Sequence, residues 1–305
     1  MNKALIVVVG PTAVGKTDLA IELARRLNGE IISADSRLFY RGMDIGTAKP
    51  SSNEMGGIIH HLIDVAEPDE NWSLATFQKR AMELIEDVQK REKMPFLVGG
   101  TGQYIHAVVD GWDIPAQEAN LALRTVLDDW AREIGTLALY DKLKIIDPEA
   151  AIHIEYQNVR RTIRALEVIF LTGYKFSEQR TKGDSPYHYL MIGLNRPRSE
   201  LYGRIDQRIE AMISNGLIDE ARALINKGYD SKLPSLTAIG YREIIGYLEG
   251  RMTLEEAQVQ MKRLTRQFVR RQANWFKEND PKIHWFAMAD DVVDRAEELI
   301  RNTIL

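Results

Sequence analysis

The sequence predicts an α/β fold, in which a mostly parallel sheet has helices on both faces and carries an inserted all-helical domain. Three observations support this prediction. An apolar, β-rich run over residues 4–9 is followed by a glycine-rich turn and then by leucines at helical spacing. Short apolar runs alternate with helical patterns up to residue 112 and again from residue 188. Residues 113–187 show amphipathic helices and no convincing strand.

The first part of the α/β core is expected over residues 1–112. Its opening run is apolar at every position, which is typical of a central parallel strand covered on both faces. Helical patterns lie between some of these strands, and this alternation is typical of a doubly wound α/β core with parallel strands. The elements predicted here are strands at residues 4–9, 30–34, 58–65 and 95–98, and helices at residues 18–27 and 73–90.

The helical insert is expected over residues 113–187, and residues 188–305 form the second part of the core with basic C-terminal helices. Turn signals mark the edges of the insert, with Gly111 and Pro115 before it and the run Gly183 to Pro186 after it. Helices are predicted at residues 120–133, 137–146, 158–171, 199–213, 217–225 and 254–275, and strands at residues 189–194 and 283–288.

Length and composition limit the class of protein. The 305 residues, 45% of them hydrophobic, suffice for about two structural units with a sizeable core. A net charge of -4 excludes the overall basic balance of a protein that coats nucleic acid nonspecifically. The absence of cysteine excludes disulfides, thiolate zinc sites and a cysteine nucleophile. No apolar run approaches the roughly 20 residues of a membrane span, so we expect a soluble, cytoplasmic protein without a membrane partner.

The strongest chemical signal is the glycine-rich segment between the first predicted strand and helix. It fits the pattern of a phosphate-binding loop (P-loop): Gly, four residues of any type, Gly, Lys, then Ser or Thr. In such a loop, backbone N–H groups and a helix N-terminus surround a diphosphate, Lys16 adds positive charge and the Thr17 hydroxyl suits a Mg²⁺ ion. This glycine loop comprises Gly10, Pro11, Thr12, Ala13, Val14, Gly15, Lys16 and Thr17.

Two more polar side chains follow predicted strands and should lie at the same edge of the sheet. Asp35 follows the second strand, at the carboxyl edge where ligands of such folds bind. It can bind Mg²⁺ through water, act as a general base, or cap the next turn. Thr101 follows the strand at residues 95–98, among glycines that permit close backbone approach.

Basic residues gather in three places although the chain is acidic overall. A charge run is usually a solvated helix face, but three of them on an acidic protein favour contact with a phosphate backbone. The three clusters are Arg160, Arg161 and Arg164 in the insert; Arg196, Arg198, Arg204 and Arg208; and residues 258–277, with six basic residues and no acid.

Two other patterns are predicted to be structural. The last long helix carries an apolar stripe that is expected to face the core, and tryptophans in general are expected in the core rather than as base-stacking platforms. Adjacent His60 and His61 point to opposite faces of a strand, so no metal site is expected there. The stripe consists of Met261, Leu264, Phe268 and Trp275.

Together these segments resemble the tRNA dimethylallyltransferase family, also called tRNA isopentenyltransferase or IPP transferase. The resemblance covers nearly the whole chain, in the family's order. Residues 41–50 are its most specific part, since a phosphate loop alone does not separate this family from many kinases. The matching strings are residues 10–17, 35–36, 40–50, 61–64, 99–102, 164–167 and 240–243.

The resemblance implies transfer of a dimethylallyl group from dimethylallyl diphosphate to the N6 amine of the adenosine just 3′ of the anticodon. The tRNAs would be those that read codons beginning with U, and the products N6-dimethylallyladenosine and diphosphate. The glycine loop would hold the leaving diphosphate, with Lys16 and Mg²⁺ neutralising its charge. Asp35 would orient the amine and take its proton, and Thr101 would assist. ATP can bind such a loop without being the substrate, and a monomer is expected by analogy.

The resemblance also implies an interface with the tRNA anticodon stem-loop. The target base must leave its stack to reach a buried edge, so a helical insert that clamps the stem-loop has a physical purpose. Many members have Gln where this chain has Leu38 and Arg160, which changes a polar contact at the first position and adds a charge at the second. The residues implied to contact tRNA are Asp35, Ser36, Arg37, Leu38, Thr101, Arg160, Arg161, Thr162, Ile163, Arg164, Thr237, Gly240, Tyr241 and Arg242.

Three alternatives stay open at this point. A small-molecule kinase would use ATP on the same loop, with Asp35 as base and the insert as lid, and would need no RNA. In a non-catalytic RNA-binding module the glycine loop would be structural. Such a protein would keep its tRNA affinity after Lys16→Ala, and it would have no turnover for this substitution to reduce. An enzyme that prenylates free adenine nucleotides is disfavoured, because so small an acceptor needs no helical clamp.

Overall fold

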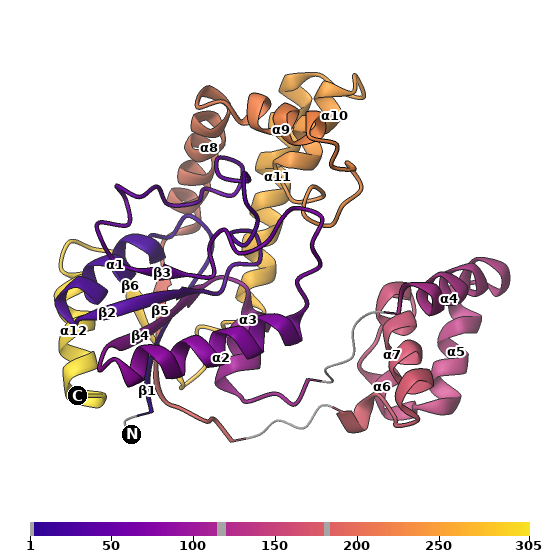
Figure 1. The fold of residues 1–305 in the computed structure, drawn as a ribbon, viewed down its shortest axis with the longest axis horizontal. Coiled ribbons are helices and arrows are strands. Elements are labelled where there is room, and N and C mark those ends of the chain that lie inside the picture. Colours follow the sequence, from indigo (N-terminus) through magenta and orange to yellow (C-terminus); the bar gives the residue numbers. More distant parts are fainter. Residues whose placement is uncertain (1–2, 115–119, 180–183) are drawn as a thin grey trace. The chain divides into compact units, whose positions relative to one another are not determined.

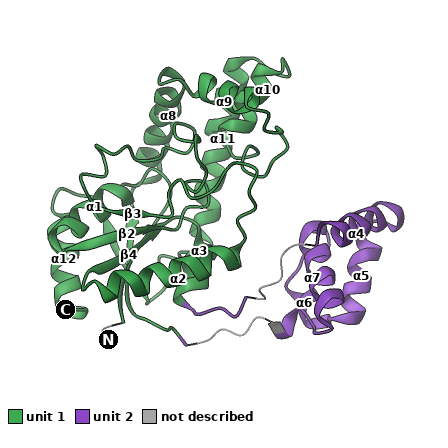
Figure 2. Cartoon of the chain, in the orientation of Figure 1, with its two compact units in different colours: residues 1–109, 185–305 green, residues 110–184 purple. Residues whose placement is uncertain are grey.

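The computed structural model describes residues 3–114, 120–179 and 184–305, and it confirms the predicted α/β class. The chain divides into two compact units (Figure 2). We call residues 1–109 with 185–305 the core unit, and residues 110–184 the helical unit. The sequence prediction placed the insert at residues 113–187; its turn signals at Pro115 and Gly183 lie outside the described residues.

The core unit is built on a six-stranded sheet of order β3-β2-β4-β1-β5-β6, in which every described pair of strands is parallel. Strand β1 lies inside the sheet, since Ile6 is paired with Phe96 of β4 on one side and with Leu190 of β5 on the other. All of β1 is buried, which explains its unbroken apolar sequence. The strands are β1 (Ala4–Val9), β2 (Gly29–Ser33), β3 (His60–His61), β4 (Met94–Gly99), β5 (His188–Asn195) and β6 (Ile283–Ala287).

Helices cover both faces of this sheet (Figure 1). Helices α1 (Lys16–Arg26) and α12 (Val292–Thr303) pack together on one face, and α2 (Leu74–Lys90) packs with α3 (Gly102–Val109) on the other. The remaining helices of the core unit pack on one another as a separate group (Figure 1). They are α8 (Arg198–Ser214), α9 (Leu217–Asn226), α10 (Tyr241–Leu248) and α11 (Leu254–Ala273).

The helical unit has an apolar core of its own, with Leu139, Leu143 and Leu166 fully buried. Asn120 and Asn158, predicted as the first residues of two helices, are instead their N-caps and accept backbone N–H groups of Leu123 and Arg161. The helices of this unit are α4 (Leu121–Ile134), α5 (Thr136–Ile146), α6 (Pro148–Ile152) and α7 (Val159–Thr172), followed by the short 3₁₀ segment Ser177–Gln179.

The structure departs from the prediction in one strand and four helices. The strand predicted at residues 58–65 is reduced to β3, because Leu62 and Asp64 adopt positive φ angles of 61° and 54° that extended backbone does not allow. Helices α3, α6, α10 and α12 form where the sequence prediction has none; the first three have at most eight residues each. In the three described ranges, no helix combines the length and apolar character that crossing a bilayer requires.

Candidate active site

The parallel strands bring four segments to one edge of the sheet. There β1 leads into the glycine loop, β2 into Asp35, β4 into Thr101 and β5 into Arg196. The chain leaves β1 toward β2 and later returns on its other side with β5, so this edge is the switch point at which α/β sheets bind ligands.

Two cavities lie at this edge, and both belong to the core unit. The large cavity has a volume of about 590 Å³ and the small cavity about 130 Å³. Thr101 lines only the large cavity, and Lys16 and Thr17 line only the small one. Asp35 lines both, so this residue forms part of the wall that the two spaces share. The residues common to both cavities are Thr12, Ala13, Asp35, Thr47, Ala48 and Arg208.

The glycine loop is held by cationic side chains that bind its carbonyl oxygens. Lys16 Nζ donates to Pro11 O over 2.8 Å, Arg204 Nε to Ala13 O over 2.8 Å, and Arg196 Nε to Val14 O over 2.9 Å. At its start, a Cβ on Gly10 would lie 2.7 Å from Leu194 O, and the φ of 145° there also favours glycine. The prediction that Arg196 and Arg204 serve RNA contact is therefore corrected: both hold the loop that follows β1.

Lys16 gives the small cavity a titratable positive charge. Desolvation lowers the pKa of Lys16 to about 8, although Asp35 raises it, and the positive charge of Arg208 lowers it further. An anion placed in the small cavity would raise the pKa of this ammonium group. Arg204 and Arg208 line the same cavity, so this space favours an anionic ligand.

Asp35 fills one of the three roles that the sequence left open, that of a cap for the next turn. Its Oδ1 accepts the backbone N–H of Arg37 over 2.9 Å, which is the expected turn cap, and the carboxylate also borders both cavities. Ser36 and Arg37 line the large cavity. Leu38, expected at the tRNA interface, instead lines the small cavity. This placement puts an apolar side chain beside the anion-binding space.

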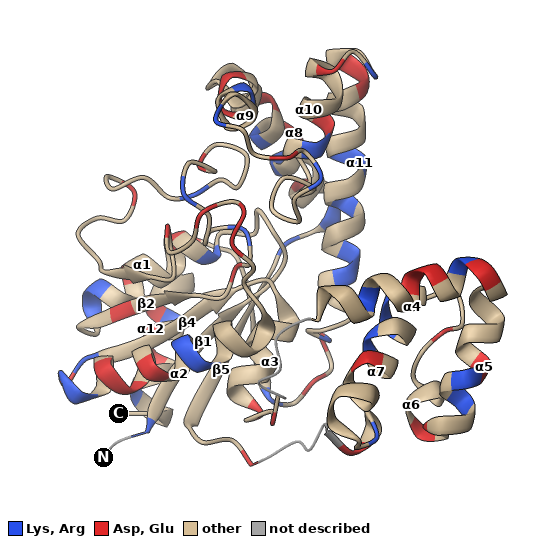
Figure 3. Ribbon diagram, turned by 45° about the vertical axis from the view of Figure 1, so that its right-hand side comes forward, with Lys and Arg blue, Asp and Glu red and all other residues tan. Residues whose placement is uncertain are grey.

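Helix α11 provides a wall of the large cavity, which corrects the predicted core-facing stripe. Met261 is buried, whereas Leu264, Phe268 and Trp275 are only partly covered and line the large cavity with it. Trp275, just past the helix end, keeps 42% of its surface exposed. These side chains turn toward the cavity because α11 packs on α8 and α10 rather than on the sheet. Lys and Arg recur along this helix (Figure 3).

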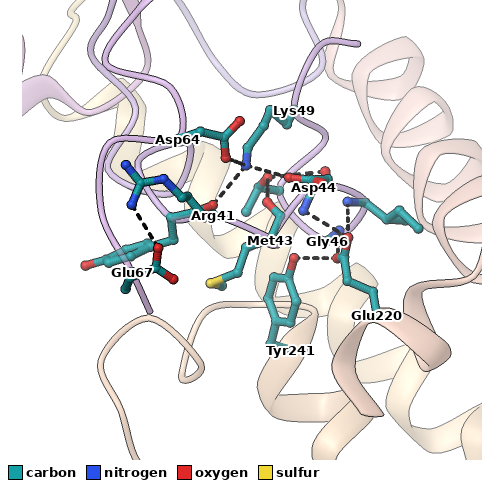
Figure 4. A network of polar contacts seen from close by, with 12 residues as sticks. Arg41, Met43, Asp44, Gly46, Lys49, Asp64, Glu67, Glu220 and Tyr241 are labelled. Atoms are coloured by element: carbon teal, nitrogen blue, oxygen red, sulfur yellow. Dashed lines mark hydrogen bonds and ion pairs between the residues drawn. The ribbon is translucent and has the colours of Figure 1, made fainter. Parts of the chain in front are cut away.

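A second wall of the large cavity comes from residues 41–50, which a polar network fixes (Figure 4). Glu220 accepts the backbone N–H groups of Asp44, Ile45 and Gly46 over 2.8–3.0 Å, and the Tyr241 hydroxyl over 2.6 Å. Lys49 donates to the Tyr40 carbonyl and forms ion pairs with Asp44 and Asp64. This network presents Gly46, Thr47 and Ala48 to the cavity. Sequence reasoning missed Glu220, because it lies far along the chain from the loop it holds.

Several residues implied to contact tRNA are not available through their side chains. Tyr241 is fully buried, and its burial and the bond to Glu220 raise its pKa. Thr162 and Ile163 are buried inside the helical unit. Arg164 Nη1 donates to Glu167 over 2.7 Å, and Glu167 is fully buried. Tyr241, Thr162 and Ile163 are therefore too buried to contact tRNA through their side chains, which corrects the expectation for these three, whereas the Arg164 side chain stays partly exposed.

Other residues of that set remain accessible. Arg160 and Arg161 are exposed on α7, and Thr237 and Arg242 are exposed and line the large cavity. The backbone N–H of Gly240 donates to Glu243 over 2.8 Å, so Gly240 belongs to the start of α10. His61 is paired with buried Glu30, and the described residues contain no group of three or more metal-binding side chains of the His, Cys, Asp or Glu type.

Comparison with known proteins gives a consistent result. The family model described as IPP transferase matches residues 38–279. The chain is 49% identical to the tRNA dimethylallyltransferase of Roseiflexus sp. (strain RS-1), with 98% of each chain covered. It is 46% identical to the tRNA dimethylallyltransferase of Halalkalibacterium halodurans, with 100% of this chain and 97% of the relative covered.

Solved structures of similar proteins share the fold. A full-length tRNA isopentenylpyrophosphate transferase from Bacillus halodurans matches with a TM-score of 0.75 at 44% identity, covering 99% of this chain and 97% of the other. A eukaryotic dimethylallyltransferase acting on tRNA matches with a TM-score of 0.82 at 27% identity, covering 99% of this chain and 79% of the other.

Replacing Glu220 tests the network of Figure 4. In Glu220→Ala, three backbone N–H groups and the Tyr241 hydroxyl lose their acceptor, which should lower the free energy of unfolding by about 2 kcal/mol. Thermal unfolding followed by circular dichroism should show a Tm lower by about 5 °C. Asp219→Ala, in the same helix turn with its side chain 80% exposed, is the control and should shift Tm little. Equal Tm values for the two variants would contradict this account.

Proposed function

The chain belongs to the IPP transferase family, and we propose that it catalyses dimethylallyl transfer to tRNA. The N6 amine of the adenosine 3′-adjacent to the anticodon attacks C1 of dimethylallyl diphosphate. The C–O bond breaks with its electron pair passing to the diphosphate, and the amine proton passes to Asp35. The observation that carries this proposal is the pair of cavities that meet at the Asp35 carboxylate.

The small cavity has the chemistry of a prenyl diphosphate. Its lining includes the glycine loop and three cationic side chains, which match the charge of a diphosphate. It also includes branched apolar side chains, which match a five-carbon hydrocarbon group. Lys16, Arg204 and Arg208 make up the cationic group, and Ile31, Leu38, Ile63 and Val98 the apolar group.

The donor set beside the glycine loop also fits Mg²⁺. The ion prefers oxygen ligands and commonly uses one or two protein oxygens together with phosphate oxygens and water. Thr17 and Asp18 are exposed at the start of α1 and line the small cavity, so their oxygens would hold the ion. When bound, Mg²⁺ would neutralise charge on the leaving diphosphate.

The large cavity fits an extruded base. Phe268 and Trp275 offer aromatic surface, and Thr101 and Ser36 offer hydroxyl groups beside Asp35. A base stacked there presents its amine to the shared wall of the two cavities. The exposed Arg160 and Arg161 provide charge for the phosphates of the anticodon stem-loop, in tRNAs that read codons beginning with U.

By analogy with the family we infer that the enzyme acts as a monomer, in the cytoplasm where tRNA is used. The comparisons favour prenyl transfer over the kinase alternative, because the curated relatives reported above are dimethylallyltransferases. ATP binding to the glycine loop would then compete with the donor.

The defining experiment incubates the protein and Mg²⁺ with unmodified tRNA and dimethylallyl diphosphate. The RNA is then digested, and its nucleosides are identified by mass spectrometry. Dimethylallyladenosine that requires both substrates is the expected product. Phosphorylation of a small acceptor by ATP, without any modified nucleoside, would refute the proposal.

Asp35→Asn tests the general base. The amide keeps the turn cap to the Arg37 N–H but cannot take a proton, so turnover should fall by about 100-fold or more. Isothermal titration should show donor affinity close to that of the wild type, because the glycine loop is untouched. Wild-type turnover in this variant would remove Asp35 from the mechanism.

Donor binding should weaken with rising pH. The free Lys16 has a pKa of about 8, and the diphosphate binds its protonated form more tightly. The donor Kd is therefore expected to rise by up to about tenfold per pH unit above pH 8, where the terminal phosphate is already ionised. Lys16→Arg, which stays protonated, should give a flat profile. A wild-type Kd that is constant from pH 7 to pH 9.5 would contradict this role.

Arg161→Ala should weaken tRNA binding and reduce its salt dependence. Loss of one phosphate contact lowers the slope of log K against log salt by about 1. Filter binding from 50 to 200 mM salt measures both quantities. Arg132→Ala on α4, a comparably exposed arginine paired with Asp128 and Asp129, is the matched control. Identical affinity and slope for the two variants would show that Arg161 does not contact RNA.

A further inference from the structure

A single buried side chain connects the glycine loop to the loop that carries Thr101. Gln272, near the end of α11, accepts the backbone N–H of Thr12 with its Oε1 over 2.9 Å. Its Nε2 donates to the carbonyl of Gly100 over 3.0 Å. The residue is only 5% exposed. Each end of one carboxamide therefore binds a different loop of the proposed active site.

The end of α11 and the loop of Thr101 are in close contact. A Cβ at Gly100 would lie 2.1 Å from Nε2 of Gln272, and a Cβ at Gly102 would lie 2.2 Å from the Trp275 side chain. The loop of Thr101 therefore packs directly against the end of α11. Only a side chain with one acceptor and one donor at this separation satisfies both backbone groups, since a carboxylate lacks the donor and a thioether is only a weak acceptor without a donor.

Gln272 lies among the residues that shape the large cavity. Phe268, Arg271 and Trp275 on the same stretch of chain line that cavity, whereas Thr12 borders both cavities. The bond to Thr12 therefore ties the walls proposed to hold the base to the loop proposed to hold the diphosphate.

We propose that Gln272 is a positioning residue that sets the distance between the two substrate sites. This proposal rests on the proposed function. Transfer needs the amine nitrogen and the donor C1 in line, and a misplacement of about 1 Å can cost about 100-fold in rate. Gln272 acts through backbone atoms of the two loops, so its loss should reduce kcat much more than the affinity for tRNA.

The test compares Gln272→Met and Gln272→Glu with wild type at pH 6 and pH 8, by steady-state transfer. Gln272→Met keeps the length but neither hydrogen bond, and its kcat should be about 100-fold lower at both pH values. Its KM for tRNA should stay within about threefold, since the phosphate contacts are unchanged. The KM for dimethylallyl diphosphate should rise, because Thr12 belongs to the glycine loop.

Gln272→Glu separates positioning from simple packing. At pH 8 its carboxylate faces the Gly100 carbonyl without a proton to donate, so kcat should match that of Gln272→Met. Burial raises the pKa of such a carboxyl, and at pH 6 the protonated acid can donate again. Its kcat relative to wild type should therefore recover about tenfold or more. The ratio cancels titration of the charged residues lining the same cavity: Asp35, Arg37, Arg208, Arg242 and Arg271.

Two results would overturn the proposal: wild-type kcat in Gln272→Met, or the same pH-independent loss in both variants. Circular dichroism melts establish whether each variant is folded. If Gln272→Met or Gln272→Glu does not fold, Gln272→Asn takes its place, because the shorter amide cannot reach both loops. Absence of product from the wild type would refute the proposed function instead. In that case the role of Gln272 is tested by the affinity for dimethylallyl diphosphate alone. Gln272→Met should bind this donor at least about threefold more weakly than the wild type, and equal affinity would reject the role of Gln272.

Discussion

Parallel pairing of β2 with β4, and of β4 and β5 with β1, brings the glycine loop, Asp35 and Thr101 to one edge of the sheet. Parallel strands end at the same edge, so residues far apart in sequence, Lys16, Asp35 and Thr101, meet there without any local signal that joins them. The pairing also buries β1 on both faces, which requires an unbroken apolar strand and places the strained turn at Gly10 directly after it. The two cavities follow from this arrangement, because they occupy the space beyond the strand ends.

The irregular backbone at this edge is stabilised by hydrogen bonds from side chains rather than by backbone–backbone hydrogen bonds of the kind that join strands. Arg196 and Arg204 bind carbonyls of the glycine loop, and Glu220 binds three N–H groups of the 44–46 turn. Gln272 binds one group of each kind, the N–H of Thr12 on one loop and the carbonyl of Gly100 on the other. Buried or half-buried backbone needs such partners, since each unpaired group costs about as much as a lost hydrogen bond. Charged side chains in this region therefore stabilise the loop conformation, in addition to their proposed role in ligand binding.

Sequence patterns predicted the strands, the glycine loop and the position of Asp35, because each depends on neighbouring residues. They did not predict Glu220 or Gln272, whose partners lie far along the chain and whose residue types are common on any helix surface. The basic cluster at Arg196 to Arg208 was misassigned in part, because a sequence shows charge but not the carbonyl that receives it. Helix α12 was predictable, because its buried residues Val292, Ala296 and Ile300 recur at helical spacing. No sequence pattern indicates the positive φ angles that shorten β3.

The helical unit occupies residues 110–184, entirely within the connection from α3 to β5, and has its own apolar core. From the point of view of the core unit, the helical unit is therefore part of one long loop, and the pairing of β1 with β5 must close that loop. Closure entropy grows only with the logarithm of loop length, and each doubling costs about 0.6 kcal/mol. Substantial lengthening or shortening of the insert therefore changes core stability very little. Evolution can therefore remodel the unit proposed to contact tRNA while the sheet that carries the proposed active site folds by the same contacts. Recognition and chemistry would then be separated at the level of folding.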